Sequence, residues 1–400
     1  MIRLLTFTSL YPNAEVPRHG IFVETRLRHL LASGQVESRV VAPVPWFPSQ
    51  SDRFGEYARY ARIPAQDRRH DITIDHPRYP VIPKIGMSLS PMLMALAVLP
   101  RLRAIIADGY DFDAIDAHYF YPDGVAAVWL GRQLGKPVVI TARGSDLNVL
   151  PQYRLPRRMI RWAAQNATGM ITVCQALKDV LIELGAPENG IRVLRNGIDL
   201  SRFYPPADRQ ALRQQLGLSR TTLLSVGHLV EAKGHHLVIE ALRELPDAEL
   251  LIAGDGDQEQ RLRRQAIELG LAERVRFLGT LPQEALRDYY GAADALVLAS
   301  SREGWANVLL EAMACGTPVL ATAVGGTPEV VTAPEAGRLI DERSAAAITR
   351  AAKSLFAHAP RREQTRHYAE GFSWQETTEG QLALYRDILA QGHSYTRCDK

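Results

Sequence analysis

The sequence predicts an α/β protein with two doubly wound, Rossmann-like domains that face a central cleft. Its 400 residues exceed the length of one typical domain, so two or three domains are expected. A short apolar run, a glycine-containing turn and a helical pattern follow one another repeatedly, and this succession occurs twice along the chain. Many apolar runs are uninterrupted, as in strands buried on both faces of a parallel sheet.

The predicted strands fall into two groups. The first comprises residues 3–8, 38–43, 114–117, 137–141, 169–173 and 191–194, and the second comprises 222–226, 249–253, 274–278, 295–298 and 318–321. Helices are predicted between most of them, for example over 24–31, 124–134, 175–184 and 235–244.

A boundary is predicted within residues 195–206, where Asn196-Gly197 signals a turn and two prolines end regular structure. This gives an N-terminal domain over 1–200 and a C-terminal domain over 201–371. An amphipathic helix over 372–390 joins the first domain. In open α/β sheets the ligand lies beyond the carboxyl ends of the strands, so we expect the chemistry in strand-to-helix loops.

Composition is that of a globular protein, with 46% hydrophobic and 23% charged residues. A net charge of +3 argues against a nucleic-acid binder. The first 200 residues carry +6 and the remainder −3, so the basic half would suit an anionic acceptor or membrane surface. A solvated face of mixed charge is the alternative.

The expected location is the cytoplasm. Cys174, Cys315 and Cys398 show no metal-ligand or redox spacing, which fits a reducing compartment. The short apolar N-terminus is typical of a buried strand and not of a secretion signal. Serines and Pro91 interrupt the apolar segment 85–100, which is shorter than the ~20 residues of a membrane span. No transmembrane helix is therefore expected.

The most informative stretch is 300–318, which follows a predicted strand. A helix is expected from Ala306 to residue 314, closed by Gly316, which leaves free amides near residues 305–307 for a diphosphate. Glu303 precedes this helix and Glu311 lies two turns into it. Carboxylates accept strong hydrogen bonds from sugar hydroxyls. The order of carboxylate, helix N-terminus and second carboxylate along the chain therefore matches the order of hexose, diphosphate and ribose in a nucleotide sugar. A surface acid and a solvated helix residue are the alternative interpretation.

The run 303–319, with the following Gly325-Gly326-Thr327-Pro328-Glu329, closely resembles the two-glutamate signature of family-4 retaining glycosyltransferases of the GT-B fold. The resemblance spans nearly the whole chain and is most specific in the C-terminal half. It implies that Glu303 meets the transferred sugar and Glu311 the ribose. It also implies donor contacts by the residues between them, namely Gly304, Trp305, Ala306 and Asn307.

A second loop, 227–234, follows the first strand of the C-terminal domain. Gly227 lets the backbone approach a ligand, and Lys233 offers a point charge to phosphate. The loop resembles the family's diphosphate-binding loop, but His228 stands where an arginine is common. Gly279 and Leu281 follow another strand, where similar enzymes seat the nucleobase against backbone.

In the N-terminal domain, Gly20 resembles the family's glycine near the donor phosphates. His118 ends a strand, and a core or capping role is as plausible there as a catalytic one. Arg143 ends the next strand, where many relatives have histidine. An arginine does not accept a proton but neutralises phosphate or an acidic sugar, so its role is electrostatic, with Asp146 as its orienter.

No Asp-x-Asp pair stands at a strand end in a metal-binding context, so we expect no metal cofactor. Lys233 and helix-end amides then stabilise the departing nucleoside diphosphate, with Glu303, Arg143 and His118 as the further catalytic candidates. The expected partners are a nucleotide-sugar donor and a saccharide or lipid-linked acceptor, with no nucleic acid. The alternatives are a nucleotide-sugar epimerase on the same fold and a non-catalytic binding protein.

Two segments bear on the acceptor. Residues 87–99 are apolar, and residues 153–162 interleave basic with apolar side chains. Together they would dock a lipid-linked acceptor at the inner face of an anionic membrane. A buried helix beside a solvated basic face is the alternative.

Overall fold

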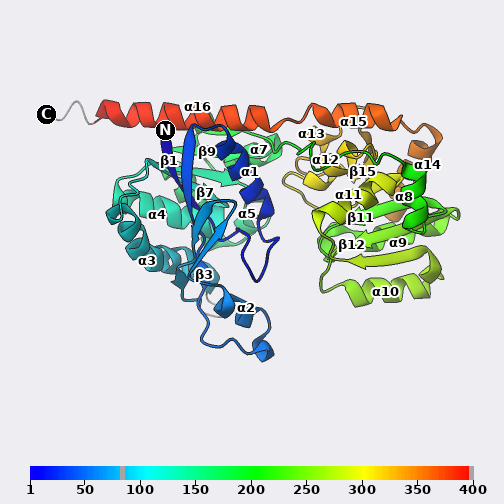
Figure 1. Cartoon of the computed structure of the whole chain (residues 1–400), viewed down its shortest axis with the longest axis horizontal. Helices are drawn as coiled ribbons and strands as arrows, with labels where there is room; N and C mark the ends of the chain where they lie inside the picture. The colour runs from blue at the N-terminus through cyan, green and yellow to red at the C-terminus, as the bar shows by residue number, and fades with distance from the viewer. Residues whose placement is uncertain (82–85, 396–400) are drawn as a thin grey trace. The chain divides into compact units, whose positions relative to one another are not determined.

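The computed structural model describes residues 1–81 and 86–395, and the chain forms two compact units (Figure 1). The first unit contains Met1–Arg195 and the chain from Gln375 onward, and the second contains Asn196–Trp374. The sequence places the two boundaries after residues 200 and 371. Cys398 lies outside the described residues, and Cys174 and Cys315 are buried.

The described residues of the first unit form an eight-stranded sheet, parallel except where β4 meets β5. In sheet order its strands are β10 (Ile191–Val193), β9 (Gly169–Thr172), β8 (Val138–Ala142), β7 (Ala114–His118), β1 (Ile2–Phe7), β2 (Val36–Val41), β5 (Ile72–Asp75) and β4 (Gln66–Arg69). A small parallel ribbon pairs β3 (Val44–Pro45) with β6 (Arg78–Tyr79). Every residue of β7 and β8 is buried, as expected for central parallel strands.

Helices flank this sheet (Figure 1). They are α1 (Ile21–Ala32), α2 (Glu56–Arg62), α3 (Gly86–Ala107), α4 (Val125–Leu134), α5 (Ser145–Asn148), α6 (Arg154–Asn166), α7 (Gln175–Glu183) and α16 (Trp374–Tyr395). The predicted C-terminal helix is thus confirmed in type. Its residues Leu382, Tyr385 and Ile388 pack with Leu4 and Ile171 of the sheet, so the end of the chain completes the core of the first unit.

The second unit has a parallel six-stranded sheet among its described residues. In sheet order its strands are β13 (Val275–Gly279), β12 (Ala248–Ala253), β11 (Thr221–Val226), β14 (Ala295–Leu298), β15 (Val319–Thr322) and β16 (Gly337–Ile340). Its helices are α8 (Arg209–Gln215), α9 (His235–Ala241), α10 (Glu259–Glu268), α11 (Gln283–Ala292), α12 (Asn307–Ala314), α13 (Thr327–Val330), α14 (Ala345–Ala357) and α15 (Arg362–Glu370). The predicted two-domain α/β architecture is confirmed.

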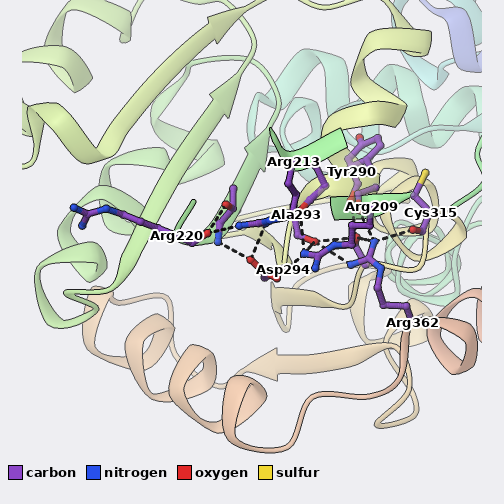
Figure 2. A network of polar contacts seen from close by, with 12 residues as sticks. Arg209, Arg213, Arg220, Tyr290, Ala293, Asp294, Cys315 and Arg362 are labelled. Carbon is purple, nitrogen blue, oxygen red and sulfur yellow. Dashed lines mark hydrogen bonds and ion pairs between the residues drawn. The ribbon is translucent and has the colours of Figure 1, made fainter. Parts of the chain in front are cut away.

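A cluster of arginines closes the amino edge of this second sheet (Figure 2). Asp294, just before β14, accepts from Arg209 at 2.5 Å and Arg213 at 3.2 Å, and the amide of Thr222 donates to it at 2.8 Å. Arg362 donates to the carbonyls of Gly291, Ala293 and Cys315, which ties α15 to the same edge. Charge-assisted bonds of this kind are among the stronger ones in proteins, so this edge has a stabilising role.

From residue 86 onward the apolar segment 85–100 lies in α3, a continuous helix that contains both Pro91 and Pro100. Among the described residues it is the one helix long and apolar enough to cross a membrane. Core helices of soluble proteins meet the same criterion, and α3 buries one face through Met94, Val98 and Leu102. Its other face exposes apolar side chains, namely Met87, Leu89, Met92 and Leu96.

Candidate active site

The carboxyl edge of the second sheet carries a row of glycines. The amide of Gly227, after β11, donates to the carbonyl of Ala253 at 3.0 Å, and the amide of Gly254 donates to that of Gly279 at 2.8 Å. Three neighbouring strands therefore end without side chains, so a ligand can approach the backbone closely. Leu281 is half-buried just beyond Gly279. This is the edge at which doubly wound sheets bind ligands.

Lys233 and Glu303, the two main catalytic candidates, lie in direct contact at this edge. The ammonium of Lys233 donates to Oε1 of Glu303 at 2.5 Å, and the hydroxyl of Ser300 donates to the same oxygen at 2.6 Å. The side chains are 27% and 10% exposed. The fold thus brings together two charges separated by 70 residues, and Ser300 is a neighbour that the sequence analysis did not single out.

The glycine loop after β15 holds Glu303 in place. A Cβ built on Gly325, whose φ is 54°, would lie 2.0 Å from the carbonyl oxygen of Glu303, so no other residue fits there. The amide of Gly326 donates to the carbonyl of Gly304 at 3.1 Å. The Gly325-Gly326 pair is therefore a support for the Glu303 loop.

Helix α12 begins immediately after the loop that carries Glu303. Its N-cap residue, Ala306, provides no side-chain cap, and Gly316 follows the helix with φ 79°. One predicted feature is wrong, because the amide of Asn307 is not free and donates to the carbonyl of Trp305 at 3.1 Å. The first helical turn still presents amides and the positive end of the helix dipole to an anion.

Glu311 lies on α12 and contacts the phenol of Tyr290, which donates to its Oε2 at 2.8 Å. Burial raises the pKa of Glu311 to about 7. The carboxyl group therefore changes charge near neutral pH. An ionised Glu311 has further acceptor capacity for a diol, as the predicted ribose contact requires.

Trp305 and Asn307 are anchored by Asn196, at the start of the second unit. The indole of Trp305 is buried and donates to the carbonyl of Asn196 at 3.1 Å, while the side-chain amide of Asn196 donates to Oδ1 of Asn307 at 3.2 Å. These contacts show that the Trp305 ring supports the loop as part of the core. The Asn196-Gly197 dipeptide signalled a turn in the sequence but gave no sign of this role.

His228 has a side chain that is 80% exposed, with Nδ1 3.5 Å from a carboxylate oxygen of Asp255. His235, which the sequence analysis missed, is buried below it. Its Nδ1 lies 2.8 Å from the hydroxyl of Ser225 and its Nε2 lies 3.3 Å from the carbonyl of His228. Burial lowers the pKa of His235 to about 4, so a neutral imidazole holds the Gly227-His228 backbone.

In the first unit, His118 and Arg143 are in contact at the ends of β7 and β8. The guanidinium of Arg143 donates to Nδ1 of His118 at 2.7 Å, and Nε2 of His118 lies 3.2 Å from a carboxylate oxygen of Asp116. Burial lowers the pKa of both His118 and Arg143, and the imidazole is neutral. Both nitrogens of His118 thus face side chains of this network, the arrangement of a residue that positions Arg143.

Asp146 orients Arg143 through the main chain. Its carboxylate accepts from the amides of Arg143 at 3.1 Å, Gly144 at 2.7 Å and Phe120 at 2.9 Å. Tyr119, next to His118, has a φ of 83°, a strained value of the kind that clusters at functional sites. The sequence gave no signal for this strain.

Gly20 is the N-cap residue of α1, with φ 67°. A Cβ there would lie 2.1 Å from the carbonyl oxygen of Leu10. The fold therefore requires glycine at this position whether or not a donor phosphate approaches it.

The structure thus builds two clusters, one in each unit. The second-unit cluster joins Glu303, Lys233 and the start of α12, and the first-unit cluster joins His118 and Arg143. In the part of the chain that the structure describes, no group of three or more histidine, cysteine or acidic side chains is placed to hold a metal ion.

Two family models match the chain. The model described as "Glycosyltransferase Family 4" matches residues 23–202, and the model described as "Glycosyl transferases group 1" matches residues 208–372. A putative teichuronic acid biosynthesis glycosyltransferase of Bacillus subtilis is 29% identical over 100% of this chain and 99% of its own length. A D-inositol 3-phosphate glycosyltransferase of Corynebacterium jeikeium is 32% identical over 72% of this chain and 75% of its own.

Solved structures agree in fold. A sucrose-phosphate synthase from Thermosynechococcus elongatus superposes with a TM-score of 0.79 at 23% identity, covering 98% of this chain and 100% of that one. The Anabaena protein HepE in complex with UDP-glucose gives a TM-score of 0.69 at 20% identity, covering 98% and 100%.

Two Rossmann-like units and the likeness to these solved structures define the GT-B fold. The matches to both halves of the chain place it in one family. The chain belongs to glycosyltransferase family 4.

Proposed function

We propose that the chain is a retaining, metal-independent glycosyltransferase that moves a sugar from a nucleoside diphosphate donor to an acceptor. The acceptor is a saccharide or a lipid-linked saccharide in the assembly of a bacterial surface polysaccharide, in the cytoplasm. One observation carries the proposal: the Lys233–Glu303 pair stands directly before the N-terminus of α12, with Glu311 farther along the same helix.

The arrangement matches the parts of a nucleotide sugar. The amides of α12 and the ammonium of Lys233 suit the diphosphate, because both supply positive charge at a glycine-rich edge. Glu303 and Glu311 then suit hydroxyl groups on either side of it. The bound UDP-glucose named for the Anabaena protein supports a nucleotide sugar as donor, and the Bacillus relative named for teichuronic acid supports the pathway class.

In the proposed step, the bond between C1 of the sugar and the β-phosphate oxygen breaks, and an acceptor oxygen bonds to C1 on the same face. The acceptor proton passes to the departing phosphate. Lys233 and the α12 amides stabilise the charge that develops on this phosphate, so no metal is required. Glu303 orients the sugar and stabilises its positive charge in the transition state.

The exposed side of the first unit supports a membrane-bound acceptor. Helix α3 exposes Met92 (60%) and Leu96 (50%). The neighbouring helix α6 exposes Arg157, Arg158 and Arg161. Apolar side chains beside basic ones favour an anionic lipid surface. Sedimentation with vesicles of anionic lipid tests this, and binding that is absent or insensitive to salt contradicts it.

A donor screen tests the whole proposal. Each nucleotide sugar is added to the full chain, and the true donor raises the unfolding free energy by about 2.7 kcal/mol at 100 times its dissociation constant. The stabilising donor is then incubated with candidate acceptors, and release of nucleoside diphosphate is measured with the anomeric configuration of the product. Donor turnover without an acceptor would indicate an epimerase, and binding with neither transfer nor hydrolysis would indicate a non-catalytic protein.

A further inference from the structure

Asp116 is a buried acid to which the proposed transfer step assigns no role. It lies on β7, two residues before His118, and is 1% exposed. Successive side chains of a strand alternate between the two faces of a sheet, so Asp116 and His118 share a face with Ala114. Ala114 packs there with residues of α1 and α16. A charge buried under these helices requires partners, and the partners of Asp116 indicate what it does.

The contacts of His118 determine which of its nitrogens carries the proton. A guanidinium only donates, and Nη2 of Arg143 lies 2.7 Å from Nδ1 of His118, so Nδ1 presents a lone pair. Burial lowers the pKa of His118, which keeps the ring neutral. The single proton is therefore on Nε2, which lies 3.2 Å from Oδ2 of Asp116 and donates to it.

This tautomer is the one that satisfies both neighbours. With the proton on Nδ1, an N–H would face the guanidinium of Arg143 and a lone pair would face the carboxylate of Asp116, and both contacts would be repulsive. With both nitrogens protonated, the imidazolium would stand against a second positive charge. Asp116 thus keeps the acceptor nitrogen of His118 turned toward Arg143. In this arrangement neither nitrogen of His118 is left to take a proton from a substrate hydroxyl.

Asp116 remains charged in these surroundings. Although burial opposes ionisation, its pKa lies below the ordinary value, because His118, Tyr385 of α16 and Arg26 of α1 stabilise the carboxylate. Arg26 is itself 1% exposed, and its Nε donates to Oε1 of Gln381 on α16 at 3.0 Å. A carboxylate accepts a stronger hydrogen bond than a neutral group does, so the charge of Asp116 strengthens its contact with the His118 ring.

Arg143 is oriented at two separate places. Asp146 accepts from its main-chain amide and fixes the backbone. The guanidinium lies against Nδ1 of His118 and over the ring of Phe22, whose centroid is 5.5 Å from the guanidinium carbon. An aromatic face attracts a cation but does not set the direction of its N–H groups. Of these two contacts, the one with His118 therefore directs the guanidinium, and His118 is in turn directed by Asp116.

We propose that Asp116 is a positioning residue for the transfer step: by fixing the Nε2–H tautomer of His118, it holds the guanidinium of Arg143 in its working orientation. The proposal rests on the transferase function proposed above. It gives Arg143 the electrostatic role at this edge of the first sheet, and it gives His118 and Asp116 the task of orienting that charge.

The first test observes the tautomer directly in the full chain. Isotopically labelled histidine is incorporated, and the ring nitrogens are followed by long-range proton–nitrogen NMR correlation near neutral pH. His118→Gln removes one of the 11 histidines and so assigns the signals of His118. We expect a neutral ring with the proton on Nε2. A protonated ring, or a neutral ring with the proton on Nδ1, overturns the proposal.

The second test compares two substitutions that both remove the charge of Asp116. Asp116→Leu provides no acceptor and should lower kcat about 10- to 100-fold, the effect of one lost hydrogen bond to a charged group. Asp116→Asn keeps an oxygen that accepts from Nε2–H and should lose about three- to tenfold. A merely structural role of the charge predicts equal losses, so equal kcat in the two variants at equal folded fraction overturns the proposal.

The third test asks whether Asp116 acts through Arg143. In an Arg143→Met background, Asp116→Leu should change kcat by less than about twofold, because the guanidinium that it orients is gone. Losses that multiply in the double variant contradict the proposal. If Asp116→Leu does not fold, the same cycle with Asp116→Asn decides the point.

Asp294→Asn is the matched control, because Asp294 also accepts from two arginines but stands at the amino edge of the second sheet. It should lower stability and leave kcat unchanged. Failures of the two proposals are distinguishable. If no donor supports transfer by the wild type, the transferase function fails, while NMR still decides the tautomer. If transfer is observed and kcat is unchanged in both Asp116 variants, only the positioning role fails.

Discussion

The contact between Lys233 and Glu303 makes a quantitative prediction about turnover. Lys233→Ala removes the ammonium, and Glu303→Gln removes the negative charge while keeping an oxygen for the hydroxyl of Ser300. A preorganised charge in a closed site supplies on the order of 3–4 kcal/mol to the transition state. Each single variant should therefore lower kcat by at least about 10²-fold.

The double variant adds a sharper test. Because Nζ of Lys233 lies 2.5 Å from Oε1 of Glu303, each residue fixes the position of the other, and removal of one impairs both. Residues that act as a unit are strongly non-additive. Two independent losses would multiply to about 10⁴-fold or more, whereas we expect the double variant to lose little beyond the more damaging single variant.

The assay is the release of nucleoside diphosphate at saturating donor and acceptor, with each variant compared at equal folded fraction. Arg263→Ala and Glu259→Gln form the control cycle, because that pair, 2.8 Å apart, is exposed on α10. Exposed pairs contribute little, and these variants should leave turnover unchanged. Near-normal turnover in both single variants, or losses that multiply in the double variant, would refute the coupled arrangement.

Three further predictions follow from particular contacts. Burial raises the pKa of Glu311 to about 7, so donor affinity should fall as pH drops below about 7 and the carboxylate is protonated, and calorimetry should find no such dependence in Glu311→Gln. Asp294→Asn weakens the charge-assisted bonds of its arginine partners and should lower the unfolding free energy in urea by about 1–3 kcal/mol, with donor affinity unchanged. Gly325→Ala displaces Glu303 and should abolish turnover, whereas Gly217→Ala, also at positive φ but with open space around it, should only reduce stability modestly.

The strands and the two-unit architecture were predictable because buried parallel strands are continuous apolar runs. The missed strands lack that signal. The antiparallel strand β4 has the sequence Gln-Asp-Arg-Arg and lies at the edge of the sheet, and β16 has an arginine among four residues. Helix α3 continues through Pro91, and the carbonyl of Met87, which an amide at position 91 would have used, accepts from the phenol of Tyr121.

The residues of the candidate site were predictable from the sequence only in part. Glu303 and Lys233 stand out in the sequence because charge beside a predicted helix start or in a glycine-containing loop is visible in a linear pattern, whereas the roles of Glu303 and Glu311 come from the family resemblance. The partners Ser300, Tyr290, His235 and Asn196 do not stand out, because each lies beside its target only after the sheet brings separate loops together.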